Sequence, residues 1–202
     1  MSFLIVPFLI TLGYSYRVAR HAALGRAYPP QYEDWGGLIV DGLRYLGIIL
    51  VAGIVGLFGV FALTAVLGSI SDTLGALTFF VGYFGLFYFG GAFLTAFIGS
   101  NSFVKSFTDG RAVQLLKSPY YLKSMLIYIA IVFVFSIITF ISIITIIGPL
   151  IVNSYAVLAF GAYWGYVYFQ ATEKGIVAPP VEDQQPAPQS GGGGGARAQP
   201  RR

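Results

Sequence analysis

The chain's longest stretch without a charged residue is residues 124–172, SMLIYIAIVFVFSIITFISIITIIGPLIVNSYAVLAFGAYWGYVYFQAT. As a single helix it would be about 70 Å long, more than twice the roughly 30 Å hydrocarbon core of a membrane. Proline breaks a helix interior and glycine tolerates a turn, so Gly148-Pro149 is the expected break. The sequence therefore predicts an antiparallel pair of membrane-spanning helices over residues 122–147 and 150–172.

A second pair of spans lies earlier in the chain, on either side of Asp72. The link between them is short, which favours antiparallel neighbours, so we expect a hairpin with spans over residues 45–70 and 74–98. The first of these spans should extend a longer helix. That helix is expected to begin at Trp35, with Asp34 as its N-cap.

The apolar run at the N-terminus is shorter. Residues 3–16 would make a helix of about 21 Å, which is less than a full span. Arg17 and Arg20 follow this run, whereas the positive charge of a signal peptide precedes its apolar stretch. We expect a short N-terminal membrane helix. Two explanations of its length stay open: packing among neighbouring helices, or the lack of some native N-terminal residues.

The composition agrees with a membrane protein. Hydrophobic residues make up 56% of the 202 residues and charged residues only 10%, with a mean hydropathy of +0.76. A soluble globular domain carries roughly 25% charged residues, so an ordinary water-soluble enzyme is excluded. The apolar runs are continuous and do not alternate, which favours helices over a β-barrel. The expected fold is all-α: a polytopic helical membrane protein with two transmembrane hairpins and a short N-terminal membrane helix.

The positive charges predict an orientation. All 12 Lys and Arg residues lie in three segments, 17–44, 105–123 and 174–202, and neither expected hairpin turn carries one. Basic residues concentrate in the cytoplasmic segments of membrane proteins. We therefore expect a multi-pass protein of the cell membrane with its N-terminus outside and its C-terminus in the cytoplasm.

The composition changes near residue 175. Residues 176–202 contain five prolines, the Gly191–Gly195 run and few large apolar side chains. Such a segment buries too little surface to fold. The expected organisation is a helical membrane domain over residues 1–175 and a disordered cytoplasmic tail over residues 176–202.

Four short motifs carry a family resemblance: Tyr14–Arg20, Glu33-Asp34-Trp35-Gly36, Val40-Asp41-Gly42-Leu43 and Lys117–Leu122. With them the chain resembles the domain-of-unknown-function 4013 family of mainly archaeal integral membrane proteins, over nearly all of residues 8–175. The family has no established activity. The resemblance therefore implies the membrane architecture and offers no catalytic residue.

The densest charged group near an expected span is Asp34, Asp41 and Arg44. On a helix the two aspartates, seven residues apart, share a face, and Arg44 can pair with Asp41 three residues before it. The group is interpreted either as a cytoplasmic gate or ion-binding mouth, or as a helix cap with an interfacial ion pair. Trp35 is expected to anchor this helix at the membrane interface; the alternative is packing against the preceding helix.

A second candidate segment, residues 103–118, alternates apolar side chains with charged ones that include Asp109 and Arg111. This pattern is typical of a basic amphipathic helix lying in the membrane interface, here broken at Gly110. It would bind lipid or a partner, or it would simply connect two spans.

Hydroxyl side chains recur every three residues in the expected span that ends near residue 147: Ser136, Thr139, Ser142 and Thr145. With Asn153 of the next span they could line a polar path for a solute. More often such hydroxyls bond to their own backbone. No charged residue is expected within the hydrophobic core of a span, so the usual marker of an ion-coupled transporter is missing.

The remaining site chemistry is sparse. The chain has no cysteine and a single histidine, His21, which excludes disulfides, cysteine zinc sites and multi-histidine metal sites. No phosphate-binding loop, nucleophile elbow or HExxH motif occurs. We therefore expect no catalytic residue, no cofactor and no metal, and the chain is not expected to be an enzyme.

Two functions stay open at this point. The first is a non-enzymatic scaffold or a protein that interacts with lipids or a partner; the alternative is a permease or channel subunit that moves a small solute through the bundle. Membrane lipids are the expected partners. A homo-oligomer or a membrane-protein partner is also open, since Gly161 and Gly165 have the spacing of a helix-packing motif that serves either packing within one chain or dimer formation. Nucleic acid is not expected.

Overall fold

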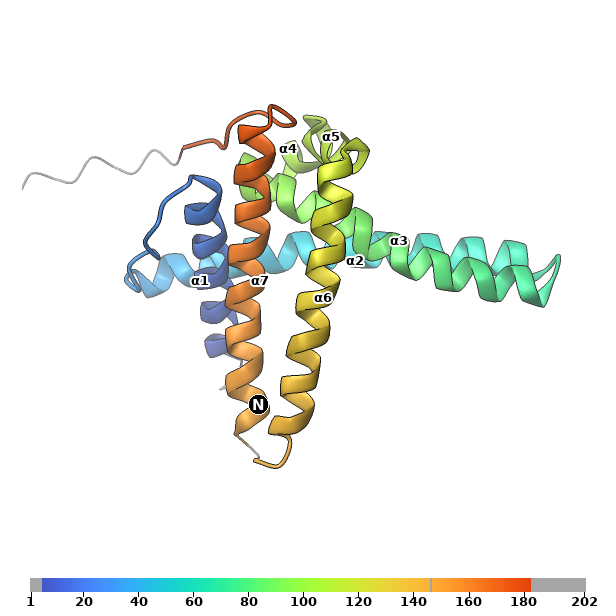
Figure 1. The fold of residues 1–202 in the computed structure, drawn as a ribbon, viewed down its shortest axis with the longest axis horizontal. Helices are drawn as coiled ribbons and strands as arrows, with labels where there is room; N and C mark the ends of the chain where they lie inside the picture. Colours follow the sequence, from blue (N-terminus) through green and yellow to red (C-terminus); the bar gives the residue numbers. More distant parts are fainter. Residues whose placement is uncertain (1–4, 146, 183–202) are drawn as a thin grey trace, which may run out of the picture.

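The computed structural model describes residues 5–145 and 147–182, and every regular element within them is a helix. The fold is therefore all-α, as predicted. Figure 1 shows α1, α6 and α7 running in a similar direction, with α2 and α3 lying across them. In chain order the helices are α1 (Ile5–Ala23), α2 (Trp35–Gly68), α3 (Asp72–Ser100), α4 (Phe103–Thr108), α5 (Arg111–Lys117), α6 (Pro119–Ser142) and α7 (Gly148–Glu173).

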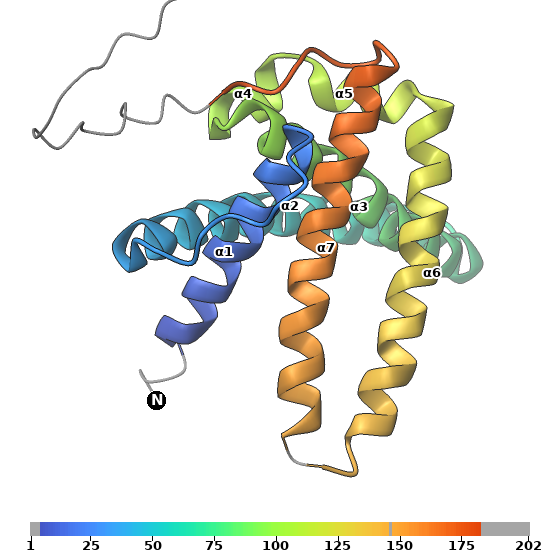
Figure 2. The ribbon, with the colours of Figure 1, turned by 60° about the vertical axis from the view of Figure 1, so that its left-hand side comes forward.

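Four of the described helices, α2, α3, α6 and α7, are long and apolar enough to cross a membrane. They form the two expected hairpins, α2–α3 and α6–α7 (Figures 1 and 2). The predicted start of α2 is confirmed. The helix begins at Trp35, and the Asp34 side chain accepts a hydrogen bond from the Gly37 backbone N–H at 3.1 Å.

The break in the second hairpin lies earlier than the sequence predicts. Helix α6 ends at Ser142, and Gly148 and Pro149 form the first turn of α7 instead of the turn between the helices. Proline is tolerated there because the first N–H groups of a helix have no partner within it. The predicted spans over 122–147 and 150–172 are therefore wrong at the end of the first and the start of the second.

The two hairpins diverge from a shared body. In Figures 1 and 2 the α2–α3 hairpin lies across α6 and α7, so the two hairpin turns point in different directions. Two hairpins that cross cannot both run along the membrane normal. Helix α2 has 34 residues and is about 51 Å long, and a helix that exceeds the hydrocarbon thickness is accommodated by tilting. The arrangement therefore requires that at least one hairpin lie obliquely in a membrane.

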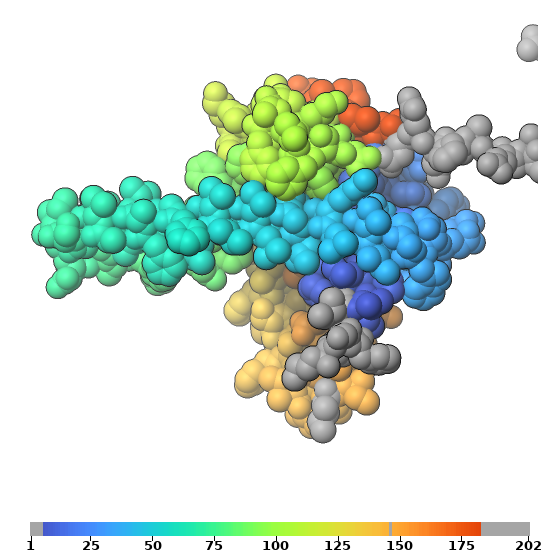
Figure 3. Space-filling view, turned by 180° about the vertical axis from the view of Figure 1, so that it is seen from behind, coloured from blue at the N-terminus to red at the C-terminus, as the bar shows by residue number. Residues whose placement is uncertain are grey.

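The outer part of the α2–α3 hairpin projects away from the body, as Figure 3 shows. It exposes large apolar side chains from both helices, among them Phe58, Leu63, Phe80 and Phe84. Soluble proteins rarely expose contiguous apolar surface of this extent. The hairpin is thus built for an apolar surrounding along its projecting length.

Helix α1 runs from the N-terminal apolar sequence into the first basic segment and packs between α2 and α7. Glycines permit this close packing. A Cβ on Gly13 would overlap the backbone carbonyl of Leu38 in α2, and one on Gly165 would overlap that of Ala19. The expected small-residue pair on α7 therefore packs against α1 of the same chain. Helix α1 is thus packed among neighbouring helices of the same chain.

Aromatic side chains fill the body where the helices meet. Tyr121, Trp164 and Tyr168 are buried together with Tyr16 and Phe97 in one core cluster. The rings of Tyr16 and Phe97 stack with centroids 5.2 Å apart, and Tyr121 and Trp164 lie 6.0 Å apart. These rings form the core of the body where the helices meet.

Residues 176–182 correct the predicted tail. They lie against the helices, with Val177 buried, and the Val181 N–H donates to the Gly99 carbonyl at 2.9 Å. The last carbonyls of a helix lack partners within it, and Val181 supplies one for α3. The prediction that the tail begins at residue 176 is therefore wrong for residues 176–182, here called the strap. Residues 183–202 of the predicted tail lie outside the described residues.

Candidate functional site

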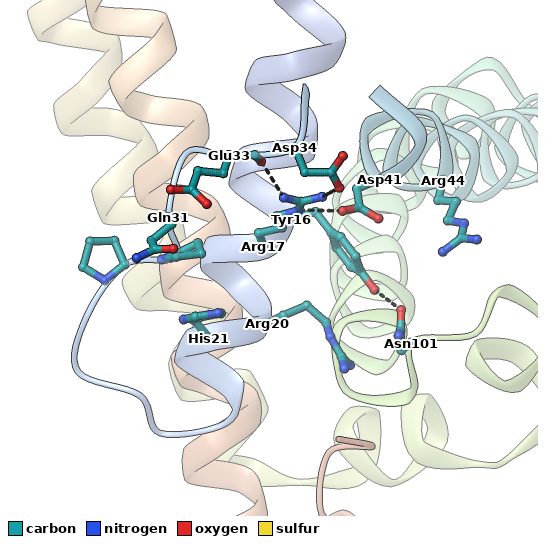
Figure 4. A pocket seen from close by; sticks show the side chains of 12 residues that line it. Tyr16, Arg17, Arg20, His21, Gln31, Glu33, Asp34, Asp41, Arg44 and Asn101 are labelled. Atoms are coloured by element: carbon teal, nitrogen blue, oxygen red, sulfur yellow. Dashed lines mark hydrogen bonds and ion pairs between the residues drawn. The ribbon is translucent and has the colours of Figure 1, made fainter. Parts of the chain in front are cut away.

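A cavity of about 560 Å³ opens where the C-terminal part of α1, the following loop and the first turns of α2 meet (Figure 4). Asn101, the residue directly after α3, closes one side. We call this cavity the polar pocket. Its charged lining consists of Arg17, Arg20, Glu33, Asp34, Asp41 and Arg44.

The polar pocket lies near the boundaries of three uncharged runs of the sequence. The first run ends at Tyr16, the second begins at Tyr45, and the third ends at Val104. Residues adjacent to these boundaries, Arg17 and Arg44, line the pocket. In a membrane-embedded chain, such a transition from uncharged to charged sequence falls at the water interface.

Arg17 links the two predicted aspartates across helices. Its Nε lies 2.7 Å from Asp41 Oδ2, its Nη2 lies 3.3 Å from Asp34 Oδ2, and its Nη1 donates to the Glu33 carbonyl at 3.1 Å. The expectation that Asp34 and Asp41 share a face is confirmed. The predicted pair of Asp41 with Arg44 is wrong, because α1 passes close enough to α2 for Arg17 to reach the carboxylate first.

Asp34 combines two tasks. Its Oδ1 caps α2 by accepting from the Gly37 N–H, and its Oδ2 faces Arg17. The backbone hydrogen bond from Gly37, and after it the Arg17 guanidinium, lower the pKa of the Asp34 carboxyl below its usual value. The carboxylate is therefore ionised at neutral pH in the folded chain.

Arg20 is the buried arginine of the site, with 3% of its surface exposed. Its Nη1 donates to the Ile98 carbonyl at 2.8 Å and its Nη2 to the Val181 carbonyl at 2.7 Å. A cation at the C-terminus of a helix satisfies free carbonyls and interacts favourably with the helix dipole. Arg20 thus joins α1, the end of α3 and the strap. The sequence indicated it only as one of the basic residues after the first apolar run.

Further pocket residues were missed by sequence reasoning. Tyr16 is buried and its hydroxyl donates to Asn101 Oδ1 at 2.6 Å, while His21 Nδ1 lies 3.4 Å from the Tyr28 carbonyl. Gln31 also lines the cavity. The one available signal is position, since all of these residues lie near the end of an uncharged run or in the loop before α2.

Trp35 lies outside the polar pocket lining. Its side chain is 58% exposed and meets Tyr32 edge to face at 5.3 Å, and Tyr32 in turn meets Tyr14 at 4.8 Å. The ring is thus linked to α1 through Tyr32, and most of its surface remains open. The anchoring role predicted for Trp35 stays a prediction.

Asp109 and Arg111 form a separate cluster. The predicted break at Gly110 is confirmed, since α4 ends at Thr108 and α5 begins at Arg111. Asp109 Oδ2 lies 2.7 Å from Arg111 Nε, and Arg111 Nη1 donates to the Tyr168 hydroxyl at 2.6 Å. The Tyr168 hydroxyl donates to the Ala178 carbonyl at 2.7 Å. The cluster therefore holds the strap against the helices.

Asn153 lines a different cavity, of about 370 Å³, near the turn of the α6–α7 hairpin. Ser136 and Thr139 line it too. The Ser136 hydroxyl donates to the Val132 carbonyl at 2.8 Å and that of Ser142 to the Thr139 carbonyl at 2.7 Å, so these hydroxyls bond to their own helix. The structure does not bring Asn153 together with Asp34 or Asp41.

The described residues contain no group of three or more His, Cys, Asp or Glu side chains that could hold a metal ion. The polar pocket offers guanidinium, carboxylate, amide and phenol groups instead. These groups suit recognition of a charged or zwitterionic polar group by hydrogen bonds and ion pairs.

The all-helical fold with four apolar helices of membrane length places the chain in the class of helical membrane proteins. It belongs to the DUF4013 family, described as a protein of unknown function, whose profile matches residues 1–147. The match confirms the suspected family and ends just before α7. No curated protein and no solved structure matches the chain.

Proposed function

We propose that this chain is a non-enzymatic multi-pass membrane scaffold that acts by binding lipids or a protein partner. The observation that carries the proposal is the aromatic cluster buried in the helix body. Trp164 is buried there, with its ring centroid 4.8 Å from that of Tyr128, and the Tyr121 hydroxyl donates to the Tyr88 carbonyl at 2.8 Å. A solute route would need polar groups or water in this space.

A permease or channel subunit is the second candidate. The cavity lined by Ser136, Thr139 and Asn153 favours it, because three polar side chains gather there between two apolar helices. However, a transport route would have to join this cavity to the polar pocket. The two cavities share no lining residue.

The basic residues also favour one orientation of the chain in the membrane. The described basic residues lie in or beside the body, and the described part of each hairpin turn carries none. Since basic residues favour the cytoplasmic side, the polar pocket would face the cytoplasm and both hairpin turns would point outward. The α1 N-terminus would then lie on the outer side.

The test is extraction of the full chain from its native membrane into polymer-bounded discs, followed by mass spectrometry of lipids and proteins. Membranes without the tagged chain serve as the background. The proposal expects a lipid class or a protein enriched well above the bulk membrane. Two results together would contradict the proposal: extracted discs with the bulk lipid composition and no partner, and solute uptake by proteoliposomes of the purified chain. They would favour the permease function over the scaffold function.

A further inference from the structure

We propose that the polar pocket binds the phosphate group of a membrane-lipid headgroup and that Arg44 is its cationic contact. This inference deepens the proposed lipid-binding function and rests on it. It follows from three features of the pocket: its depth in the chain, the distribution of its charges, and its size.

Depth comes first. Arg44 directly precedes the uncharged run that begins at Tyr45, and Arg17 directly follows the run that ends at Tyr16. The pocket between them therefore lies at the boundary where lipid phosphates lie in a bilayer. A cavity lined by polar groups at this depth meets headgroups before it meets dissolved solutes.

The three arginines of the pocket differ in their hydrogen-bond and ion-pair partners. Arg17 faces two carboxylates, Asp34 and Asp41, and Arg20 donates to the carbonyls that end α3 and the strap. Arg44 is exposed and lines the pocket, and among the described residues it has no hydrogen-bond or ion-pair partner. It is thus the pocket arginine available to an incoming anion. Guanidinium groups bind phosphate oxygens through paired N–H donors.

A negative charge lies at the other end of the pocket. In Figure 4 Glu33 and Arg44 lie on opposite sides of Arg17 and its two aspartates. Such a separation of charge complements a zwitterion better than a bare anion. A headgroup with both a phosphate and an amine would place the phosphate near Arg44 and the amine near Glu33.

The size also fits. Small-molecule sites typically enclose about 300–1,000 Å³, and the polar pocket, at about 560 Å³, lies within that range. A headgroup would fill it while the acyl chains stay in the membrane beside α2. The adjoining helix surface is apolar, with Leu43 and Ile49 exposed on either side of Arg44 in sequence.

Native mass spectrometry of the full chain in detergent tests the inference. The probes are phosphatidylethanolamine, phosphatidylglycerol and diacylglycerol, the last of which lacks a phosphate, and inorganic phosphate added as a competitor. The variant is Arg44→Ala. The matched control is Arg26→Ala, which removes an equal charge from an exposed loop position outside the pocket lining.

We expect one retained molecule of each phospholipid and none of diacylglycerol. Loss of one cation near a phosphate should weaken retention about fivefold in Arg44→Ala, with little change in Arg26→Ala. Arg44→Lys should retain part of the binding, and Glu33→Gln should weaken phosphatidylethanolamine but not phosphatidylglycerol. Equal unfolding temperatures of the two alanine variants would show that folding is intact.

Other results would overturn the inference in distinguishable ways. Retention that is unchanged in Arg44→Ala would exclude the pocket while leaving lipid binding elsewhere and the proposed function intact. Equal losses in Arg44→Ala and Arg26→Ala would reduce the effect to general surface charge. Full displacement by millimolar inorganic phosphate would assign the site to a free phosphate. No retained lipid of any kind would remove lipid binding from the proposed function as well.

Discussion

Arg17 and Asp41 join α1 to α2 through an ion pair with 2.7 Å between Nε and Oδ2. Both side chains are about four-fifths buried, at 23% and 20% exposure. The pair lies beside the close approach of Gly13 and Gly42, where the two helix backbones touch. It therefore fixes the register of α1 against α2 at the edge of the polar pocket.

Asp41→Asn should lower the free energy of unfolding by about 1–3 kcal/mol, because a partly buried charged hydrogen bond is lost. Asp34→Asn is the matched control. It removes the same charge from the exposed side of Arg17 and preserves an N-cap side chain, so a smaller effect is expected. Thermal unfolding in detergent compares the two. An equal loss in both variants would contradict the central role of the Arg17–Asp41 pair.

Gly165→Ala should force α7 away from α1, since its Cβ would overlap the Ala19 carbonyl. Overpacking of this kind costs about 1–3 kcal/mol. Gly47→Ala in α2 is the control, because a Cβ there meets nothing within 4 Å and alanine favours a helix by up to about 1 kcal/mol. Unfolding measurements should therefore move in opposite directions. A neutral Gly165→Ala would mean that the two helices do not touch in this way.

Removal of the strap should destabilise the chain. Deletion from residue 176 onward removes buried Val177 and the carbonyl acceptors of Arg20 and Tyr168, at about 1–3 kcal/mol for each buried polar group left unsatisfied. Deletion of residues 191–202 is the control and should change little, since that sequence holds no large apolar side chain to bury. The measurement is the melting temperature of both truncated chains in the same detergent. Equal melting temperatures would show that the strap does not stabilise the folded chain.

Some elements could be predicted because local chemistry determines them. Asp34 followed by a glycine-rich turn predicts the start of α2. Gly110 predicts the break between α4 and α5, and in the structure its φ is 77°. Composition likewise predicts the apolar helices. Local signals place helix ends to within a few residues, as the early end of α6 shows.

Other features depend on contacts that no local pattern contains. Spacing within one helix suggested Arg44 as the partner of Asp41, but the observed partner, Arg17, lies 24 residues earlier in the chain. Hydropathy predicts that two hairpins exist and carries no information on how they cross. The docking of the strap was missed because its proline-rich composition is typical of a tail, while its hydrogen bonds come from Arg20 and the end of α3.

Trp35 should lie at the membrane interface. Its exposed indole lies at the first residue of α2, and amphipathic rings favour the headgroup region. In a Trp164→Phe variant, which leaves Trp35 as the one tryptophan, brominated lipids with shallow labels should quench fluorescence strongly. Deep labels should quench it less. An absence of quenching at every depth would exclude lipid contact.

Cysteine labelling most directly tests the central claim that both hairpins cross the membrane while the charged body stays on one side. The native chain has no cysteine, so Asp72→Cys, Thr145→Cys and Lys117→Cys each give one reactive site. In intact cells an impermeant thiol reagent should label position 72 in the α2–α3 turn and position 145 in the α6–α7 turn, and should reach position 117 only after lysis. Labelling of position 72 only after lysis, together with position 117, would show that the α2–α3 hairpin does not cross and would contradict the account.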